Sequence, residues 1–206
     1  MKQLIGVLFV ALLLIGCKAQ EVRVDLTYDD ILSAYEGEDV MVPFEATFRL
    51  LGDMDDEQRA QITDIERIIE NYVDVEFFEI RSANFGTDVV IEGQIMLTQH
   101  ISGGDAWYLG VSDSNLGSDF ITVQVVTGGS FDRFIGEMRN VNFMLTPSAY
   151  HPVNFRLRAS DAEVLAPAAQ VDGQTHLLWR GTVSGRTTLS FSGDPFENTG
   201  AGFMIR

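Results

Sequence analysis

Apolar and polar residues alternate along much of the chain, and each alternating stretch predicts a β-strand with one buried face. The clearest stretch is residues 40–50, in which every second side chain from Val40 to Leu50 is apolar. Pro43 lies on the opposite face and favours a position at the start or edge of a sheet. Further strands are predicted at residues 22–26, 73–80, 89–98, 107–111, 120–126, 153–157, 163–166, 176–183, 187–191 and 202–205.

One long segment follows a helical period instead. The isoleucines at positions 62, 65, 68 and 69 recur at the spacing that places them on one helix face. Acidic residues at positions 55–57 precede them, and the helix dipole favours negative charge at the start of a helix. We therefore predict that residues 55–72 form the main helix.

Two shorter helices are also predicted. Residues 27–35 begin at Thr27, whose side chain can cap a helix together with Asp30. Residues 131–138 follow Ser130, a second candidate cap. Because helices and strands do not alternate regularly, the pattern predicts an α+β fold with a largely antiparallel sheet. We expect one domain, with a subdivision near residues 99–105 as the alternative.

The beginning of the chain has the layout of a secretion signal. A basic start at Lys2 is followed by an apolar run over residues 4–15, and the small residue Gly16 precedes Cys17. The apolar run is shorter than the roughly 20 residues that a membrane-spanning helix needs, which favours a cleaved signal over a permanent anchor. The motif Leu14-Ile15-Gly16-Cys17 resembles the lipobox of bacterial lipoprotein precursors.

The lipobox resemblance implies a lipid anchor at Cys17. In such precursors the cysteine thiol receives diacylglycerol, a signal peptidase removes the residues before it, and the new N-terminus receives a further acyl chain such as palmitate. Residues 1–16 would then be the signal peptide and residues 17–206 the mature protein. Several acyl chains hold a protein stably on a membrane where one chain does not. Cys17 is the only cysteine, so it has no disulfide partner within the chain.

The residue after Cys17 bears on the compartment. In Gram-negative lipoproteins an aspartate at this position resembles a signal for retention in the inner membrane, whereas this chain has Lys18. The resemblance therefore implies a lipid-anchored protein of the cell envelope, on the outer membrane rather than the inner one.

A second resemblance covers about the first half of the chain. The stretches Val22-x-Val24-Asp25-Leu26, Asp29-Asp30-Ile31 and Val42-Pro43-x-x-Ala46-Thr47 are similar to those of small lipoproteins encoded by proteobacteria and their phages or prophages. Members of that group often have additional cysteines in the mature domain, and this chain has none. The resemblance implies an envelope location and a phage or prophage lineage, without implying an activity.

The charge of the chain argues against one class of partner. The sequence has 14 basic and 30 acidic residues, a formal net charge of −16 at pH 7. Nucleic-acid recognition needs a basic surface, so nucleic acid is not an expected partner. No lysine follows Lys18 in the sequence, which excludes a lysine nucleophile or Schiff base from the folded domain.

No catalytic motif stands out in the sequence. The three histidines, His100, His151 and His176, do not have the spacing of metal ligands. Residues 110–114 lack the second glycine of a nucleophile elbow. Carboxylate pairs of the glycosidase kind stay open, because the many acidic residues allow numerous pairings. We expect no enzyme activity, and no metal or cofactor besides the lipid on Cys17.

One acidic stretch resembles the start of a calcium-binding loop. It reads Asp53-x-Asp55-x-Glu57, but Gln58 occupies the sixth position, where such loops need glycine. Its surroundings are helical in period, so the start of a helix explains the acidic residues better.

Two neighbouring aromatic residues form the candidate recognition surface. Trp107 and Tyr108 precede a polar loop at residues 112–118, and aromatic residues beside polar loops are typical of binding sites. Placement in an ordinary strand is the alternative interpretation. The leading hypothesis is a lipid-anchored envelope protein that binds another macromolecule, an envelope protein above all. The alternative is a periplasmic carrier of a lipid or other apolar ligand, because strands around a cavity alternate like strands around a core.

Overall fold

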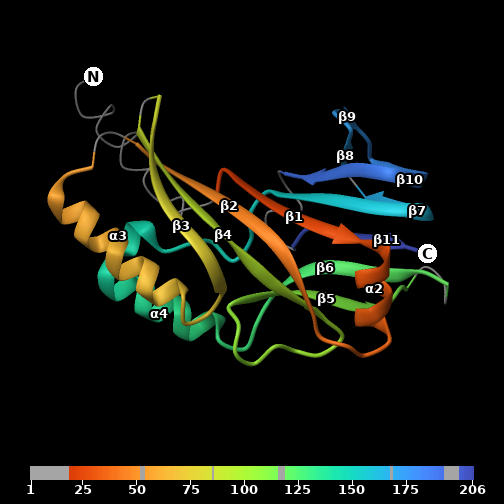
Figure 1. Ribbon diagram of the computed structural model, residues 1–206, viewed down its shortest axis with the longest axis horizontal. Coiled ribbons are helices and arrows are strands. Elements are labelled where there is room, and N and C mark those ends of the chain that lie inside the picture. Colours follow the sequence, from red (N-terminus) through yellow and green to blue (C-terminus); the bar gives the residue numbers. More distant parts are fainter. Residues whose placement is uncertain (1–18, 52–53, 85, 116–118, 168, 193–199) are drawn as a thin grey trace, which may run out of the picture.

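A computed structural model describes residues 19–51, 54–84, 86–115, 119–167, 169–192 and 200–206 (Figure 1). It confirms an α+β fold with a mostly antiparallel sheet. The helices are α2 (Tyr28–Tyr35), α3 (Asp56–Ile69) and α4 (Phe131–Val141), with a short 3-10 helix η1 (Phe143–Leu145). The strands are β1 (Glu21–Thr27), β2 (Val40–Leu51), β3 (Asp74–Ala83), β4 (Gly86–Thr98), β5 (Trp107–Asp113), β6 (Ile121–Thr127), β7 (Val153–Pro167), β8 (Gln170–Val171), β9 (Gln174–Thr175), β10 (Leu178–Phe191) and β11 (Gly202–Ile205). The expected signal peptide and Cys17 lie outside the described residues.

Seven strands close into a barrel. Their order around it is β1, β2, β4, β5, β6, β11 and β7, and a parallel pairing of β7 with β1 completes the ring. Strands from both sides of residues 99–105 contribute to this ring. Outside it, β10 pairs with β7 and with β8 of the small β8–β9 hairpin, and β3 pairs with β4.

The barrel interior is a hydrophobic core, because alternate side chains along its strands point inward. Phe155 of β7 is fully buried and packs edge-on against Phe191 and Phe203, with ring centroids 5.9 and 5.3 Å away. Helix α2 contacts β1, β2, β4, β5 and β7, and it buries Ile31 and Ala34 in the same core. The helix therefore covers one end of the barrel, on the right in Figure 1.

Two of the helix starts have capping boxes. The Oγ1 atom of Thr27 accepts a bond from the backbone nitrogen of Asp30 at 3.1 Å, and the Asp30 carboxylate accepts one from the nitrogen of Thr27 at 2.9 Å. Asp55 and Gln58 cap α3 in the same reciprocal way. Ser130 stands before α4 as predicted but does not cap it, because its hydroxyl donates to the carbonyl of Gly103 at 2.8 Å.

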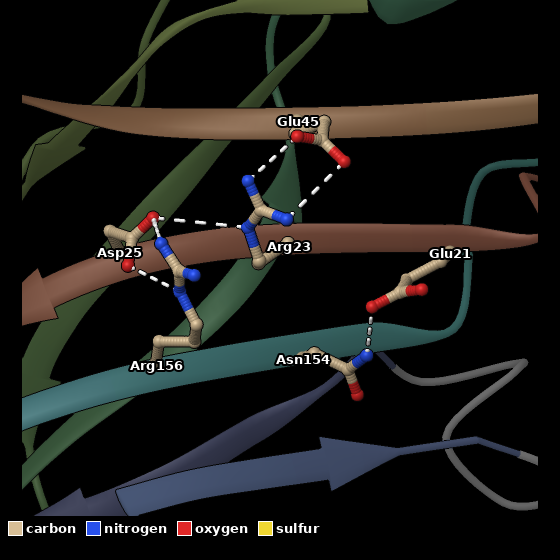
Figure 2. A network of polar contacts seen from close by, with 6 residues as sticks. All are labelled: Glu21, Arg23, Asp25, Glu45, Asn154 and Arg156. Atoms are coloured by element: carbon tan, nitrogen blue, oxygen red, sulfur yellow. Dashed lines mark hydrogen bonds and ion pairs between the residues drawn. The ribbon is translucent and has the colours of Figure 1, made fainter. Parts of the chain in front are cut away.

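A polar network covers the outside of the barrel where β1 joins β2 and β7 (Figure 2). Arg23 donates two bonds to Glu45, the shorter at 2.6 Å, and Arg156 donates two bonds to Asp25 at 2.6 and 2.5 Å. Arg23 also lies 4.0 Å from Asp25, which links the two pairs. Half-exposed ion pairs stabilise a fold by at most about 1 kcal/mol each. We infer that the network favours this strand register, while the buried core supplies most of the stability.

The structure joins two pairs of predicted strands: residues 153–157 with 163–166 in β7, and residues 176–183 with 187–191 in β10. The polar and glycine residues between them predict breaks, and that prediction is wrong. β7 and β10 stay paired through this region and absorb the irregularity as a shift in register between Val183 and Gly185. Gly185 has a φ of +104°, which glycine adopts without strain.

The β8–β9 hairpin is absent from the predicted elements, although the sequence contains a signal for it. Asp172 and Gly173 form its turn with φ values of 45° and 85°, and an Asp-Gly pair is a strong signal for a two-residue hairpin turn. The two strands are only two residues long each, so they have no visible alternation.

Charge as well as backbone pairing holds the last strand in place. Glu163 of β7 accepts side-chain bonds from Arg180 and Arg206. These two guanidinium groups, Arg180 first, hold the pKa of the Glu163 carboxyl below its ordinary 4.5. Because the pKa is lowered by folding, the contribution to stability is complete at neutral pH and is lost as the pH falls through the folded-state value.

Candidate apolar ligand site

A second hydrophobic core lies away from the end of the barrel that α2 covers. Strands β2, β3 and β4 extend away from α2, and α3 and α4 lie side by side across them (Figure 1). Phe48 and Leu50 alternate along β2 and face the helices, while Ile62 and Ile65 recur at helical spacing on α3. Phe44 packs against both cores, so the barrel core and the helix-covered core are continuous.

The junction of the two cores contains a cavity of about 130 Å³. Its wall is built from distant parts of the chain, including Val24, Ala46, Ile65, Trp107 and Met138. Among the lining residues that the structure describes, Trp107 and His151 contain a polar side-chain atom, and the others are aliphatic, phenylalanine, methionine or proline. The cavity can therefore bind an apolar group and offers little to a charged one.

Trp107 contributes a large apolar surface to this wall. Its one polar atom, Nε1, donates to the carbonyl of Ala149 at 2.8 Å. Its ring packs against the rings of Phe131 and Phe134, each with a centroid distance of 5.3 Å. The bond to Ala149 also attaches the connection between η1 and β7 to the wall.

His151 connects the cavity to the first described residues. Its ring lies edge-on to Phe48 with centroids 5.7 Å apart, and it is tilted against Trp107 at 5.6 Å. Its Nδ1 accepts a bond from the backbone nitrogen of Ala19 at 3.0 Å. The described chain therefore begins in contact with a residue of the cavity wall.

Tyr72 fixes α4 against the turn that follows α3. Its hydroxyl hydrogen-bonds to the Glu137 carboxylate at 2.6 Å, and the Arg133 guanidinium lies 5.3 Å from the centre of its ring. The bond to Glu137 and burial raise the pKa of Tyr72, and Arg133 acts in the opposite direction. The phenol stays protonated at neutral pH, so this contact holds the helix that supplies Phe134 and Met138 to the cavity.

The two candidate recognition residues lie in β5. Trp107 lines the cavity and is half-buried, whereas Tyr108 is only 6% exposed. Adjacent residues of a strand point to opposite faces of the sheet, so the two rings do not share a surface. Their role in recognition stays a prediction, as does lipidation of Cys17, which lies outside the described residues.

The remaining candidate residues are spread over the fold. His100 follows β4, His176 precedes β10, and Asp55 caps α3, while Asp53 lies outside the described residues. Within the ranges that the structure describes, no group of three or more His, Cys, Asp and Glu residues is placed to hold a metal ion.

Comparisons with known proteins find no match: no model of a known family fits the chain, and no curated protein matches it significantly. In the part of the chain that the structure describes, no helix has both the length and the apolar character needed to cross a membrane.

The sequence predicts a cavity only as the alternative to a packed core, and it does not indicate where the cavity lies. The apolar face of β2 has the same alternation whether it packs against a filled core or lines a void. Ala46 is a local signal of a void, because its small side chain lies between those of Phe44 and Phe48 on the same face of β2.

Proposed function

We propose that this protein is a lipid-anchored envelope protein of the outer membrane that binds an apolar ligand in the cavity. The supporting observation is the cavity, whose wall is almost entirely apolar and is shared by the barrel, α3 and α4. A polar ligand would lose hydration there without gaining enough hydrogen bonds. Among the described lining residues only Trp107 and His151 have polar side-chain atoms, so the geometry favours binding over catalysis.

An empty cavity of this size is unfavourable for the folded protein. Without a guest, the apolar side chains of its wall lack the dispersion contacts that they would make in a filled core. Dry cavities of about 150 Å³ with aliphatic and aromatic walls bind benzene or xenon. The ligand that fits is therefore a small ring or a stretch of a few carbons from an aliphatic chain.

The tryptophan in the wall provides a direct test. The chain has two tryptophans, and Trp179→Phe leaves Trp107 as the sole indole. We expect a fatty acid brominated along its chain to quench Trp107 emission saturably in the unlipidated W179F protein, because the quencher enters the cavity. Ala46→Leu, which adds bulk to the cavity from β2, should abolish that quenching.

Ala60→Leu is the matched control for this experiment. It makes the same change at an exposed position of α3, away from the cavity wall. Loss of quenching in A46L with retention in A60L supports ligand binding in the cavity. Equal quenching in A46L and its parent, or none in the folded parent, would show that the cavity takes no such ligand.

Binding of an envelope protein is a second proposed function with its own support. Leu177 and Leu178 are consecutive residues at the start of β10 and are 93% and 60% exposed, and Phe143 and Met144 form a separate exposed apolar pair in η1. Exposed apolar side chains that lie together are typical of surfaces that a partner covers. These residues do not line the cavity, so a partner and an apolar ligand could bind the same molecule.

A further inference from the structure

We propose that an acyl chain of the protein's own lipid anchor, attached at Cys17, is the resident occupant of the cavity. This inference rests on the proposed ligand site and specifies its ligand. It follows from where the chain enters the fold, from the chemistry of the wall, and from the number of acyl chains that a lipoprotein has.

The chain enters the fold at the cavity. Ala19 is 2% exposed, and its backbone nitrogen donates to Nδ1 of His151, which lines the cavity. The next residues are also fixed, because the nitrogen of Gln20 donates to the carbonyl of Thr47 at 2.7 Å and that of Val22 to Pro152 at 3.0 Å. Val22 itself lines the cavity.

Covalent geometry then limits how far the lipid can begin from this wall. Cys17 precedes Ala19 by two residues, and two residues of extended chain span about 7 Å at most. The lipid on Cys17 therefore starts beside the fixed Ala19–His151 contact. An acyl chain attached there begins close to His151, a residue of the cavity wall.

An acyl chain matches the apolar wall of the cavity, and one chain can leave the membrane while the protein stays anchored. The aliphatic chain needs no hydrogen bonds, and the wall has little polar surface to offer. A mature lipoprotein with diacylglycerol and an acylated amine has three chains, and two chains are enough for stable anchoring. One chain can thus enter the cavity in part while the protein stays on the membrane.

Photocrosslinking in the native envelope tests whether an acyl chain on Cys17 occupies the cavity. Cells that make the full precursor are supplied with a fatty acid bearing a diazirine near its end, and the envelope is irradiated before extraction. Trypsin cleaves the mature protein after Lys18 and releases the lipid on a dipeptide, Cys17-Lys18. It also releases two short cavity peptides, residues 60–67 from α3 and residues 134–139 from α4, for mass spectrometry.

The protein is digested after its monomer has been separated from crosslinked oligomers. The expected product is a cavity peptide crosslinked to a lipid that is still attached to the dipeptide Cys17-Lys18. Ala46→Leu should remove this product, and Ala60→Leu should keep it with the altered mass of its peptide. A cavity peptide joined to a free lipid without the dipeptide would overturn this inference and leave the proposed ligand site standing. Absence of any lipid adduct on the cavity peptides would overturn both.

Discussion

Phe155→Ala is expected to lower the free energy of unfolding by about 3–5 kcal/mol, the usual range for removal of a buried aromatic ring. Phe155 is 0% exposed and packs edge-on against Phe191 and Phe203. It lies on β7, which also pairs with β1 to close the barrel. The loss of the ring therefore leaves a void at the closing strands, and urea denaturation measures its effect.

Phe143→Ala is the matched control for this variant. Phe143 in η1 is 71% exposed, so the same truncation removes little buried surface and should change stability by less than about 0.5 kcal/mol. Similar losses in the two variants would contradict the placement of Phe155 at the centre of the barrel core.

Gly93→Ala is expected to destabilise the fold by about 3 kcal/mol, the upper part of the usual range for overpacking. A methyl group on Gly93 would overlap the carbonyl oxygen of Asp74 and would lie 3.0 Å from the carbonyl carbon of that residue. The contact is with backbone, which cannot rotate away as a side chain can. β3 is irregular at this point, with a register shift between Val75 and Phe77, so only glycine lets the two strands approach so closely.

Gly136→Ala provides the comparison for this substitution. Gly136 lies inside α4, and an added methyl group would meet no atom of another part of the protein within 4 Å. Alanine is favoured over glycine in a helix by up to about 1 kcal/mol. We expect a gain in stability at position 136 and a loss at position 93, both by urea denaturation. A tolerated G93A would show that β3 and β4 are not packed this closely.

The elements of the fold could be predicted from the sequence wherever periodicity is local. The alternation in β2 and the isoleucines of α3 place these elements within a few residues of their observed bounds. The Thr27 capping box depends on residues three apart, so it is visible in the sequence as well. The polar centre of β7 predicts a break that the structure lacks, because long pairing with β10 keeps that segment extended.

Closure of the barrel could not be predicted in the same way. It depends on the parallel pairing of β1 with β7, in which Val22 lies opposite Val153. No periodic pattern specifies which strands will pair across such a separation. The pairing is instead a consequence of how all the strands bury their apolar faces together.

The cavity follows from this closure, and the sequence analysis therefore could not locate it. The sequence predicts a recognition role for Trp107 from its aromatic character beside a polar loop, and the structure places it in the cavity wall with its Nε1 bonded to the carbonyl of Ala149. The sequence indicates no role for His151, yet in the structure its ring lies against Phe48 and its Nδ1 accepts a bond from Ala19. Both placements depend on contacts between distant segments.

Xenon binding tests most directly whether the cavity accepts an apolar guest. Crystals of the unlipidated protein would be pressurised with xenon, a probe with no polar requirement. The expected result is an anomalous peak between Ala46, Ile65 and Trp107 in the wild type and no peak there in A46L. Wild-type crystals with no xenon at this position, or with the space filled by the protein's own side chains, would contradict the assignment of an apolar ligand site.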